Sequence, residues 1–300
     1  AYANDPCEYF APKIAPESSS YNDKTLRLIS QMHKAITIIQ FKLEAAAIRR
    51  HPEFDMDSRL LLHHIDFKRK VFQLDGKDYE MRDCLFPTID PENPYQLTEE
   101  EEEIVQKLHK SFTGSEKLRK HMKCIFRYGC MYNVCNSNLL FHASMPMNAD
   151  GTLKEVDILG KKYKGEALLK RVGQLIRTAY FAEEDDPEKA FARDFIWYLW
   201  CGKNSPAFDK SKMATFERYF LTDKETHKEV KGYYYALRDR EDICDMILDE
   251  FGVEGEHRHI INGHVPVKAV KGEKPIKANG KLMVIDGGFS KAYQPETGIA

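Results

Sequence analysis

The feature that most restricts the fold of this chain is a short β-branched run that stops at a turn and is followed by a histidine. Ile260–Ile261 form the run, Asn262–Gly263 make the turn, and His264 follows. This order is typical of a histidine held at the end of a buried strand, facing a site and not the core. The stretch Asn138–Phe141 presents His142 in the same way. Two strand-end histidines far apart in sequence suit a discontinuous metal site, although two ligands alone bind a catalytic metal poorly.

Short apolar strands alternate with helices in the second half of the chain. The helical segment 165–251 follows the strand before His142, and two more apolar runs, Ile260–Ile261 and Leu282–Ile285, follow that segment. Strands and helices in this order predict a mixed α/β (α+β) fold with a sandwich architecture. The ends of its sheet are where we expect the chemistry.

We expect the chain to have two parts. Residues 1–125 are predicted to be mainly helical, with a small hairpin at Val71–Tyr79 that turns at an Asp-Gly pair. Residues 126–300 are predicted to hold the strands and the helical segment 165–251. Ala1–Ser20 has the composition of a loop and the last residues stop just after a turn, so we expect a piece of a longer protein.

A long helix is predicted near the beginning of the chain. Asn22 or Asp23 can cap it, and it should end at about Arg50. Apolar residues at helical spacing predict one buried stripe: Leu26, Ile29, Ile36, Ile39 and Leu43. The opposite, polar face is predicted to carry Lys24, Arg27, Lys34, Lys42 and Glu44. Thr98 and Glu101 predict a capping box on a later helix, whose acidic first turn we expect to be solvated.

Composition excludes several classes of function. The formal net charge is −2, from 45 basic and 47 acidic residues, so there is no basic excess for a nucleic-acid partner. The seven cysteines are scattered singly, without a Cys-x-x-Cys pair, which is typical of a reduced, cytoplasmic protein with buried thiols. No apolar stretch approaches the ~20 residues of a membrane span. We therefore expect neither a nucleic-acid nor a membrane partner.

Each candidate site residue has a structural alternative. His142 and His264 could be core histidines that are hydrogen-bonded to the backbone, although Ala143 and Ser144 would let a ligand approach closely, and Gly263 frees the backbone before His264. Asp286 also closes a strand and could orient one of the histidines. By itself it would be read as part of a plain turn.

A second group of residues suits phosphate. Lys203, Ser205 and Arg218 lie in or after a Cys-Gly-Lys loop, and lysine and arginine bind phosphate as a point charge and as a fork. The loop lacks the Gly-x4-Gly-Lys-Ser/Thr pattern of a P-loop. A Gly-x-Ser-x-Gly elbow and a dinucleotide-binding Gly-x-Gly-x-x-Gly are also absent, which disfavours serine hydrolases and dinucleotide enzymes.

Two segments resemble motifs of the calcineurin-like metallophosphatases. Phe141–Pro146 is similar to their "histidine, two small residues, apolar" segment, and Asn262–Pro266 to their later Gly-His motif. Over essentially all 300 residues the chain resembles the class III fructose-1,6-bisphosphatases, bacterial members of that superfamily. The runs that carry this wider resemblance are Leu28–Ile36, Trp200–Pro206, Lys212–Phe220 and Val284–Tyr293.

The resemblance implies a partial metallophosphatase β-sandwich flanked by helices, with a large helical insertion. It implies hydrolysis of the 1-phosphate of fructose 1,6-bisphosphate at a binuclear Mn²⁺ or Mg²⁺ centre, with His142 and His264 on the same metal. The family's Asp-x-His, Gly-Asp-x-x-Asp-Arg and Gly-Asn-His-Glu/Asp motifs, which supply the other ligands, the bridging aspartate and the general acid, do not occur in the chain. We therefore expect no catalytic residue within these 300 residues, and no activity from them alone.

Two other functions stay open on the sequence. The chain could belong to a different metallophosphoesterase, acting on phosphoproteins or dinucleoside polyphosphates. It could also be non-enzymatic, with the helices of residues 22–123 forming a docking or homo-oligomerisation module and the histidines serving the fold.

Overall fold

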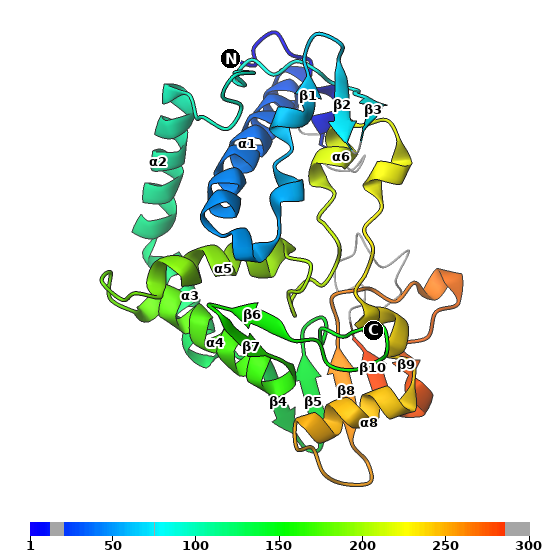
Figure 1. The fold of residues 1–300 in the computed structure, drawn as a ribbon. Helices are drawn as coiled ribbons and strands as arrows, with labels where there is room; N and C mark the ends of the chain where they lie inside the picture. Colours follow the sequence, from blue (N-terminus) through cyan, green and yellow to red (C-terminus); the bar gives the residue numbers. More distant parts are fainter. Residues whose placement is uncertain (13–20, 75, 286–300) are drawn as a thin grey trace. The chain divides into compact units, whose positions relative to one another are not determined.

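The computed structural model describes residues 1–12, 21–74 and 76–285 (Figure 1). Packing divides the chain into two compact units. The first comprises Ala1–Arg119 and Ala214–Lys228, and the second comprises Lys120–Met213 and Glu229–Ala300. The sequence placed the boundary at 125/126, close to the first of these breaks, but it did not indicate that residues 214–228 return to the first unit.

The first unit is built on one long helix, α1 (Asp23–Arg50). The Asn22 side chain caps it by accepting a hydrogen bond from the Thr25 amide at 2.9 Å. The predicted capping box begins α2 (Glu99–Gly114). The predicted hairpin is also confirmed, and its strands belong to an antiparallel sheet of three: β1 (Ile65–Asp66), β2 (Val71–Leu74) and β3 (Lys77–Glu80). Short helices complete the unit: α6 (Thr215–Phe220) and the 3-10 helices η1 (Glu8–Phe10), η3 (Pro52–Phe54), η4 (Asp57–Arg59), η5 (Leu62–His64) and η6 (Lys224–His227).

The buried face of α1 agrees only in part with the apolar pattern, since Ile39 is buried as predicted and Lys24 and Arg27 are exposed. Ile36 and Leu43 are exposed, at 41% and 44%, whereas Lys34 and Lys42 are fully buried. The physical reason is charge pairing, since a lysine can be buried when its ammonium group meets carboxylates. Lys42 Nζ lies 2.7 Å from Glu101 Oε2, so Glu101 is buried, whereas the other acidic residues in the first turn of α2 are exposed, as expected.

The second unit alternates strands and helices, as the sequence predicted, and α3 (Glu116–Tyr128) runs into it across the first break. Its strands are β4 (Tyr132–Cys135), β5 (Asn138–Phe141), β6 (Val156–Ile158), β7 (Lys161–Tyr163), β8 (His259–Asn262), β9 (Ile276–Lys277) and β10 (Leu282–Val284). Its helices are α4 (Gly165–Phe181), α5 (Lys189–Cys201), α7 (Tyr233–Leu237), α8 (Glu241–Glu250) and the 3-10 helices η7 (Ala269–Lys271) and η8 (Ala278–Gly280). A mixed α/β architecture is therefore confirmed.

A five-stranded sheet organises this second unit. Its strand order is β4-β5-β8-β10-β9. The three middle strands, β5, β8 and β10, are parallel to one another, and the edge strands β4 and β9 run antiparallel to their neighbours. Because parallel strands end at the same edge of a sheet, the residues that follow β5, β8 and β10 meet there. These are the positions of both strand-end histidines.

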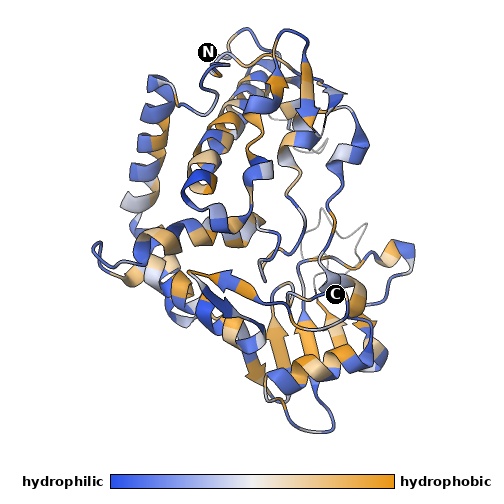
Figure 2. Cartoon of the chain, viewed as in Figure 1, coloured by the Kyte–Doolittle hydropathy of each residue, from blue (hydrophilic) through white to orange (hydrophobic). Residues whose placement is uncertain are grey.

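The main core of the second unit lies around these strands. Leu139, Ile260 and Leu282, one from each parallel strand, are fully buried and pack with Ile247 and Leu248 of α8. Figure 2 shows these strands as hydrophobic, as expected of strands in a parallel sheet. None of the helices in the described part of the chain is long and apolar enough to span a bilayer.

Candidate functional site

The structure brings the two strand-end histidines together. His142 follows β5 directly, and His264 lies two residues after β8, which is the parallel neighbour of β5. Their ring centroids are 5.1 Å apart, with 69° between the ring planes. The Gly263 amide donates a hydrogen bond to the His142 carbonyl at 2.8 Å, so the two strand ends are joined through the backbone as well.

The backbone at His264 adopts an unusual conformation. Its φ is +67°, in a region that costs a non-glycine residue about 1–3 kcal/mol. The Val265 amide donates to the Gly263 carbonyl at 2.8 Å, which closes a tight turn around His264. The sequence suggested that Gly263 would supply the conformational freedom, but Gly263 is not among the residues with positive φ. Strain of this kind is concentrated at functional sites, where the surroundings hold the residue in place.

The electrostatic surroundings keep His264 uncharged. Burial of the ring lowers its pKa to about 4, and the neighbouring His142 and Lys210 act in the same direction. Its Nε2 atom is buried without a hydrogen-bond partner among the described residues. A buried ring nitrogen without a partner is costly in a structural histidine, whereas a neutral imidazole is the form that binds a metal.

A pocket of about 450 Å³ opens in front of the pair. Both histidines line it, together with residues from β4, the end of β5, the end of β8, and Ile285. His142 itself is exposed, so a ligand could reach the pair from solvent.

Asn262, the last residue of β8, supports the site from behind. Its Nδ2 donates to the Ala143 carbonyl at 3.1 Å and to the Tyr234 hydroxyl at 2.8 Å. Tyr234 is 1% exposed and packs edge-on against Phe141, with ring centroids 5.8 Å apart. The amide thereby ties the segment after His142 to the strand that carries His264. Its Oδ1 is buried without a partner among the described residues.

A buried carboxylate lies beneath the same segment. Asp209 is 4% exposed, burial raises its pKa, and it accepts a short hydrogen bond from the Ser144 hydroxyl. The space around it is tight, since a Cβ on Gly232 would fall 2.0 Å from one of its carboxylate oxygens. Ala143 and Ser144 therefore anchor the loop after His142; the sequence had suggested instead that they leave room for a ligand.

The histidine pair fits part of a metal site. Two imidazole rings stand side by side, and one of them has an unpartnered nitrogen. Within the described ranges, no cluster of three or more histidine, cysteine, aspartate or glutamate side chains could hold a metal ion. Asp286, the predicted orienting carboxylate, lies outside the described residues. The described part of the chain therefore offers two ligands of one kind and would need others to complete the site.

The predicted phosphate residues belong to two different units of the chain. Ser205 is fully buried, and its hydroxyl donates to the Leu199 carbonyl at 2.6 Å and accepts from the Ala207 amide at 3.1 Å. Lys203 is half-buried in the same turn of the second unit, whereas Arg218 is exposed on α6 in the first unit. A substrate role for these three residues stays a prediction.

Sequence reasoning missed the residues that hold the histidines. Asn262 was read as half of a turn signal, and Asp209 and Tyr234 were not singled out. Asn262 carried a usable signal, since a polar amide at the end of a buried apolar strand needs partners. Nothing in the local sequence marks the other two, because their partners lie far along the chain.

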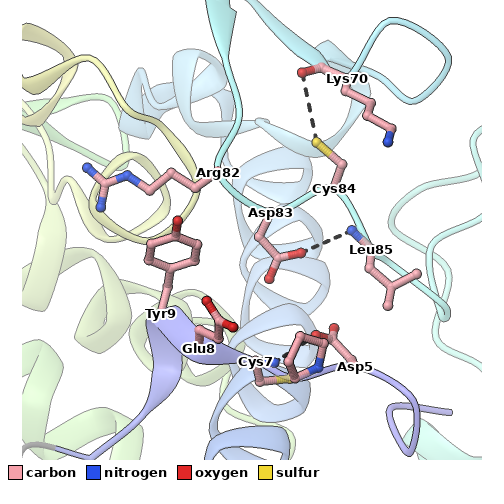
Figure 3. Close-up of a pocket in the computed structure, with 10 residues that line it drawn as sticks. Asp5, Cys7, Glu8, Tyr9, Lys70, Arg82, Asp83, Cys84 and Leu85 are labelled. Carbon is pink, nitrogen blue, oxygen red and sulfur yellow. Dashed lines mark hydrogen bonds between the residues drawn. The ribbon is translucent and has the colours of Figure 1, made fainter.

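A second cavity lies within the first unit and holds two thiols (Figure 3). Cys7 and Cys84 line it, beside Asp5, Arg82 and Asp83. Burial raises the pKa of Cys7 to about 12 and also raises the pKa of Cys84. Neither thiol is therefore a nucleophile near neutral pH, since the thiolate is the reactive form.

Comparison with known proteins shows which family the chain belongs to. Residues 1–300 match the family described as Firmicute fructose-1,6-bisphosphatase. The chain belongs to this family. It is 69% identical over 300 residues to a class 3 fructose-1,6-bisphosphatase of Phocaeicola vulgatus and 65% identical over 300 residues to that of Parabacteroides distasonis. It is 56% identical over 299 residues to that of Clostridium acetobutylicum.

The family relatives are longer proteins. Each of these three alignments covers 100% of this chain but only 45% of the relative. The chain thus spans a little under half the length of the curated relatives that it matches. No solved structure matches it significantly. Membership of the class III family, inferred above from residues, is confirmed.

Proposed function

We propose that the full-length protein containing this chain hydrolyses the 1-phosphate of fructose 1,6-bisphosphate. We further propose that His142 and His264 are two ligands of one metal in its active site. The paired rings, with the unpartnered Nε2 of His264, are the observation that carries the metal assignment. The relatives' name, fructose-1,6-bisphosphatase class 3, supports the reaction.

The chemistry would be that of a binuclear Mn²⁺ or Mg²⁺ centre. Such a pair polarises the phosphate and supplies a water of lowered pKa for in-line attack. This chain's part is to present two imidazole nitrogens. The depressed pKa of His264 keeps its ring unprotonated at neutral pH, so no proton competes for the nitrogen. The strained turn at His264 and the Asn262 amide fix the ring positions before a ligand arrives.

The other metal ligands, the bridging aspartate and the general acid are proposed to lie outside the described residues. We place the sheet of the second unit in a metallophosphatase sandwich whose other half supplies the bridging aspartate and the general acid. Asp286 would orient one of the histidines, and Lys203 and Arg218 would contact phosphate. We also propose that the protein acts in the cytoplasm.

The test is phosphate release by the full-length protein, with Mn²⁺ or Mg²⁺ added after chelation. The substrates are fructose 1,6-bisphosphate, a phosphoprotein and a dinucleoside polyphosphate. Metal-dependent release from the sugar bisphosphate supports the proposal. Release only from another substrate class would retain the metal site and overturn the substrate. Full activity on the sugar bisphosphate without bound metal, measured by elemental analysis of the same sample, would retain the reaction and overturn the metal assignment.

A further inference from the structure

Helix α2, at the edge of the first unit in Figure 1, carries an apolar stripe that the described residues leave exposed. Ile104, Leu108 and Phe112 follow one another at intervals of four residues, so they share one face of the helix. Their exposed fractions are 41%, 40% and 62%. Glu101 is the one residue of this fully described helix that is buried, and its ion pair with Lys42 fastens the first turn to α1. A surface helix normally buries its apolar face, so this stripe suits a partner.

The charges on α2 divide the helix into an acidic half and a basic half. Five consecutive glutamates, Glu99–Glu103, fill its first turns. The second half carries Lys107, His109 and Lys110, and the next acidic residue in the sequence is Glu116, beyond the end of the helix. The helix dipole accounts for this order of charges in a single helix. It does not account for the exposed apolar stripe that lies along both halves.

Helix α1 exposes a second apolar stripe, but its charges do not suit self-association. Leu28, Met32 and Ile36 are 54%, 61% and 41% exposed. Basic residues outnumber acidic ones at both ends of this helix. The beginning holds Lys24 and Arg27 with Asp23, and the end holds Arg49 and Arg50 with Glu44. Two copies of α1 would therefore place like charges together in either orientation, whereas on α2 both the stripe and the charges suit a second copy.

We propose that α2 is the surface through which two copies of the protein associate, packed antiparallel about a two-fold axis. Such an interface uses the same patch on both copies, so the patch must complement itself. If Ile104 of each copy packs on Leu108 of the other, residues 100–103 of one copy lie opposite residues 109–112 of the other. The acidic half of each helix then runs along the basic half of its partner, and the helix dipoles oppose each other favourably. A parallel pair would instead set glutamates against glutamates.

The first test is Leu108→Glu in the full-length protein. It places a carboxylate at the centre of the contact, where it is desolvated without a partner, so the Kd of the dimer should rise by more than about 100-fold. Gln106→Glu is the matched control, because it adds the same charge at an exposed position on the opposite side of α2 and should leave the Kd unchanged. Sedimentation equilibrium over a range of protein concentrations measures the mass of both variants and of the wild type, and this readout does not depend on enzymatic activity.

Several outcomes of this experiment would overturn the proposal. A dimer that Leu108→Glu leaves intact uses another surface. A wild type that stays monomeric, with a melting temperature lowered more by Leu108→Glu than by Gln106→Glu, would show that another part of its own chain covers the stripe. If circular dichroism shows that Leu108→Glu does not fold, Phe112→Ser at the most exposed position of the stripe replaces it and should also raise the Kd.

The charge pattern is tested by mixing two charge-reversed proteins. One carries Glu102→Lys with Glu103→Lys, and the other carries Lys107→Glu with Lys110→Glu. Both lose the exposed pair of Glu103 and Lys107 within the helix, at 3.1 Å, so they are matched in that respect. Each alone should dimerise about 10-fold more weakly than the wild type, because like charges then meet across the interface. An equimolar mixture should form mixed dimers with a Kd near that of the wild type. Equal self-association of all three proteins, or no gain on mixing, would contradict the charge-matched contact.

Discussion

A buried lysine on helix α1 is fully paired, whereas buried polar atoms at the carboxyl end of the parallel sheet lack hydrogen-bond partners among the described residues. Lys34 on α1 is fully buried, yet its ammonium group meets Asp5, Asp83 and the Leu85 carbonyl at 2.5, 2.7 and 2.7 Å. At the sheet end, His264 Nε2 and Asn262 Oδ1 are buried without hydrogen-bond partners among the described residues.

This difference distinguishes polar groups that stabilise the fold from polar groups that are available to bind a ligand. A buried charge that is completely paired stabilises its own neighbourhood once it is in place, because removing one member leaves the others unpaired. Unpaired polar atoms lower stability, and folded proteins keep few of them. Where two such residues line one pocket, as His264 and Asn262 do, the missing partners are best sought in a ligand. Each prediction below tests one side of this comparison.

The largest effect is expected at α1. Lys34→Met should lower the local free energy of unfolding by about 3–5 kcal/mol, because Asp5 and Asp83 are left without their cation. Hydrogen exchange of the α1 amides in the full-length protein measures this. Lys24→Met, at an exposed position of the same helix, should change it by less than about 0.5 kcal/mol. Equal protection in both variants would show that the pairing does not hold the helix.

At the carboxyl end of the sheet, substitutions are expected to lower enzymatic activity. His264→Ala and His142→Ala should each lower kcat by more than about 100-fold, which is the upper range for residues that only support a metal ligand. Metal content, measured by elemental analysis, should fall with the rate. His257→Ala, in the exposed loop before β8, is the control and should retain both. Normal metal content in the His264 variant would remove that residue from the ligand set.

The Asn262 amide should have a smaller effect of the same kind. Asn262→Ala is expected to weaken metal affinity by about 10- to 100-fold, since the amide holds the segment after His142. Tyr234→Phe removes the Tyr234 hydroxyl but keeps the hydrogen bond from the Asn262 amide to the Ala143 carbonyl, so it should weaken metal affinity by less. Metal titration with a chelating competitor measures both variants. A larger loss in Tyr234→Phe than in Asn262→Ala would reverse their assigned importance.

The smallest predicted effect is on the stability of the protein at low pH. Burial by itself would raise the pKa of Asp5, but hydrogen bonds from Lys34 and the Cys7 amide outweigh it, so the pKa is lowered. A carboxylate with a lowered folded-state pKa adds stability above its unfolded pKa, near 3.9, and loses it as pH falls through the folded value. The stability difference between wild type and Asp5→Asn should therefore shrink below about pH 4. A difference that stays constant between pH 6 and pH 3 would contradict this.

Much of the fold could be predicted from local sequence, but the pairing of charges could not. Caps at Asn22 and Thr98, and the β-branched run at Ile260–Ile261, act over a few residues and were predicted correctly. The buried face of α1 was predicted only in part, because hydrophobic periodicity assigns every lysine to solvent. The partners that bury Lys34 and Lys42 lie far away in the chain.

The candidate site, too, could be predicted only in part from local sequence. The two histidines could be found because each directly follows a strand signal. That β5 and β8 are parallel neighbours follows from topology, which no local pattern contains.

The side-chain bond from Asn262 to the Ala143 carbonyl also has a consequence for the order of folding. It joins residues 119 positions apart, and the pairing of β5 with β8 spans a similar length of chain. Closing a loop of this size costs entropy before any contact compensates, which makes such pairing slow. During synthesis the local β4–β5 hairpin can form early, whereas β5 cannot pair with β8 until β8 has been synthesised. The pair of histidines is therefore assembled late, and any ligand of the pair has no such site to bind before residue 264 emerges.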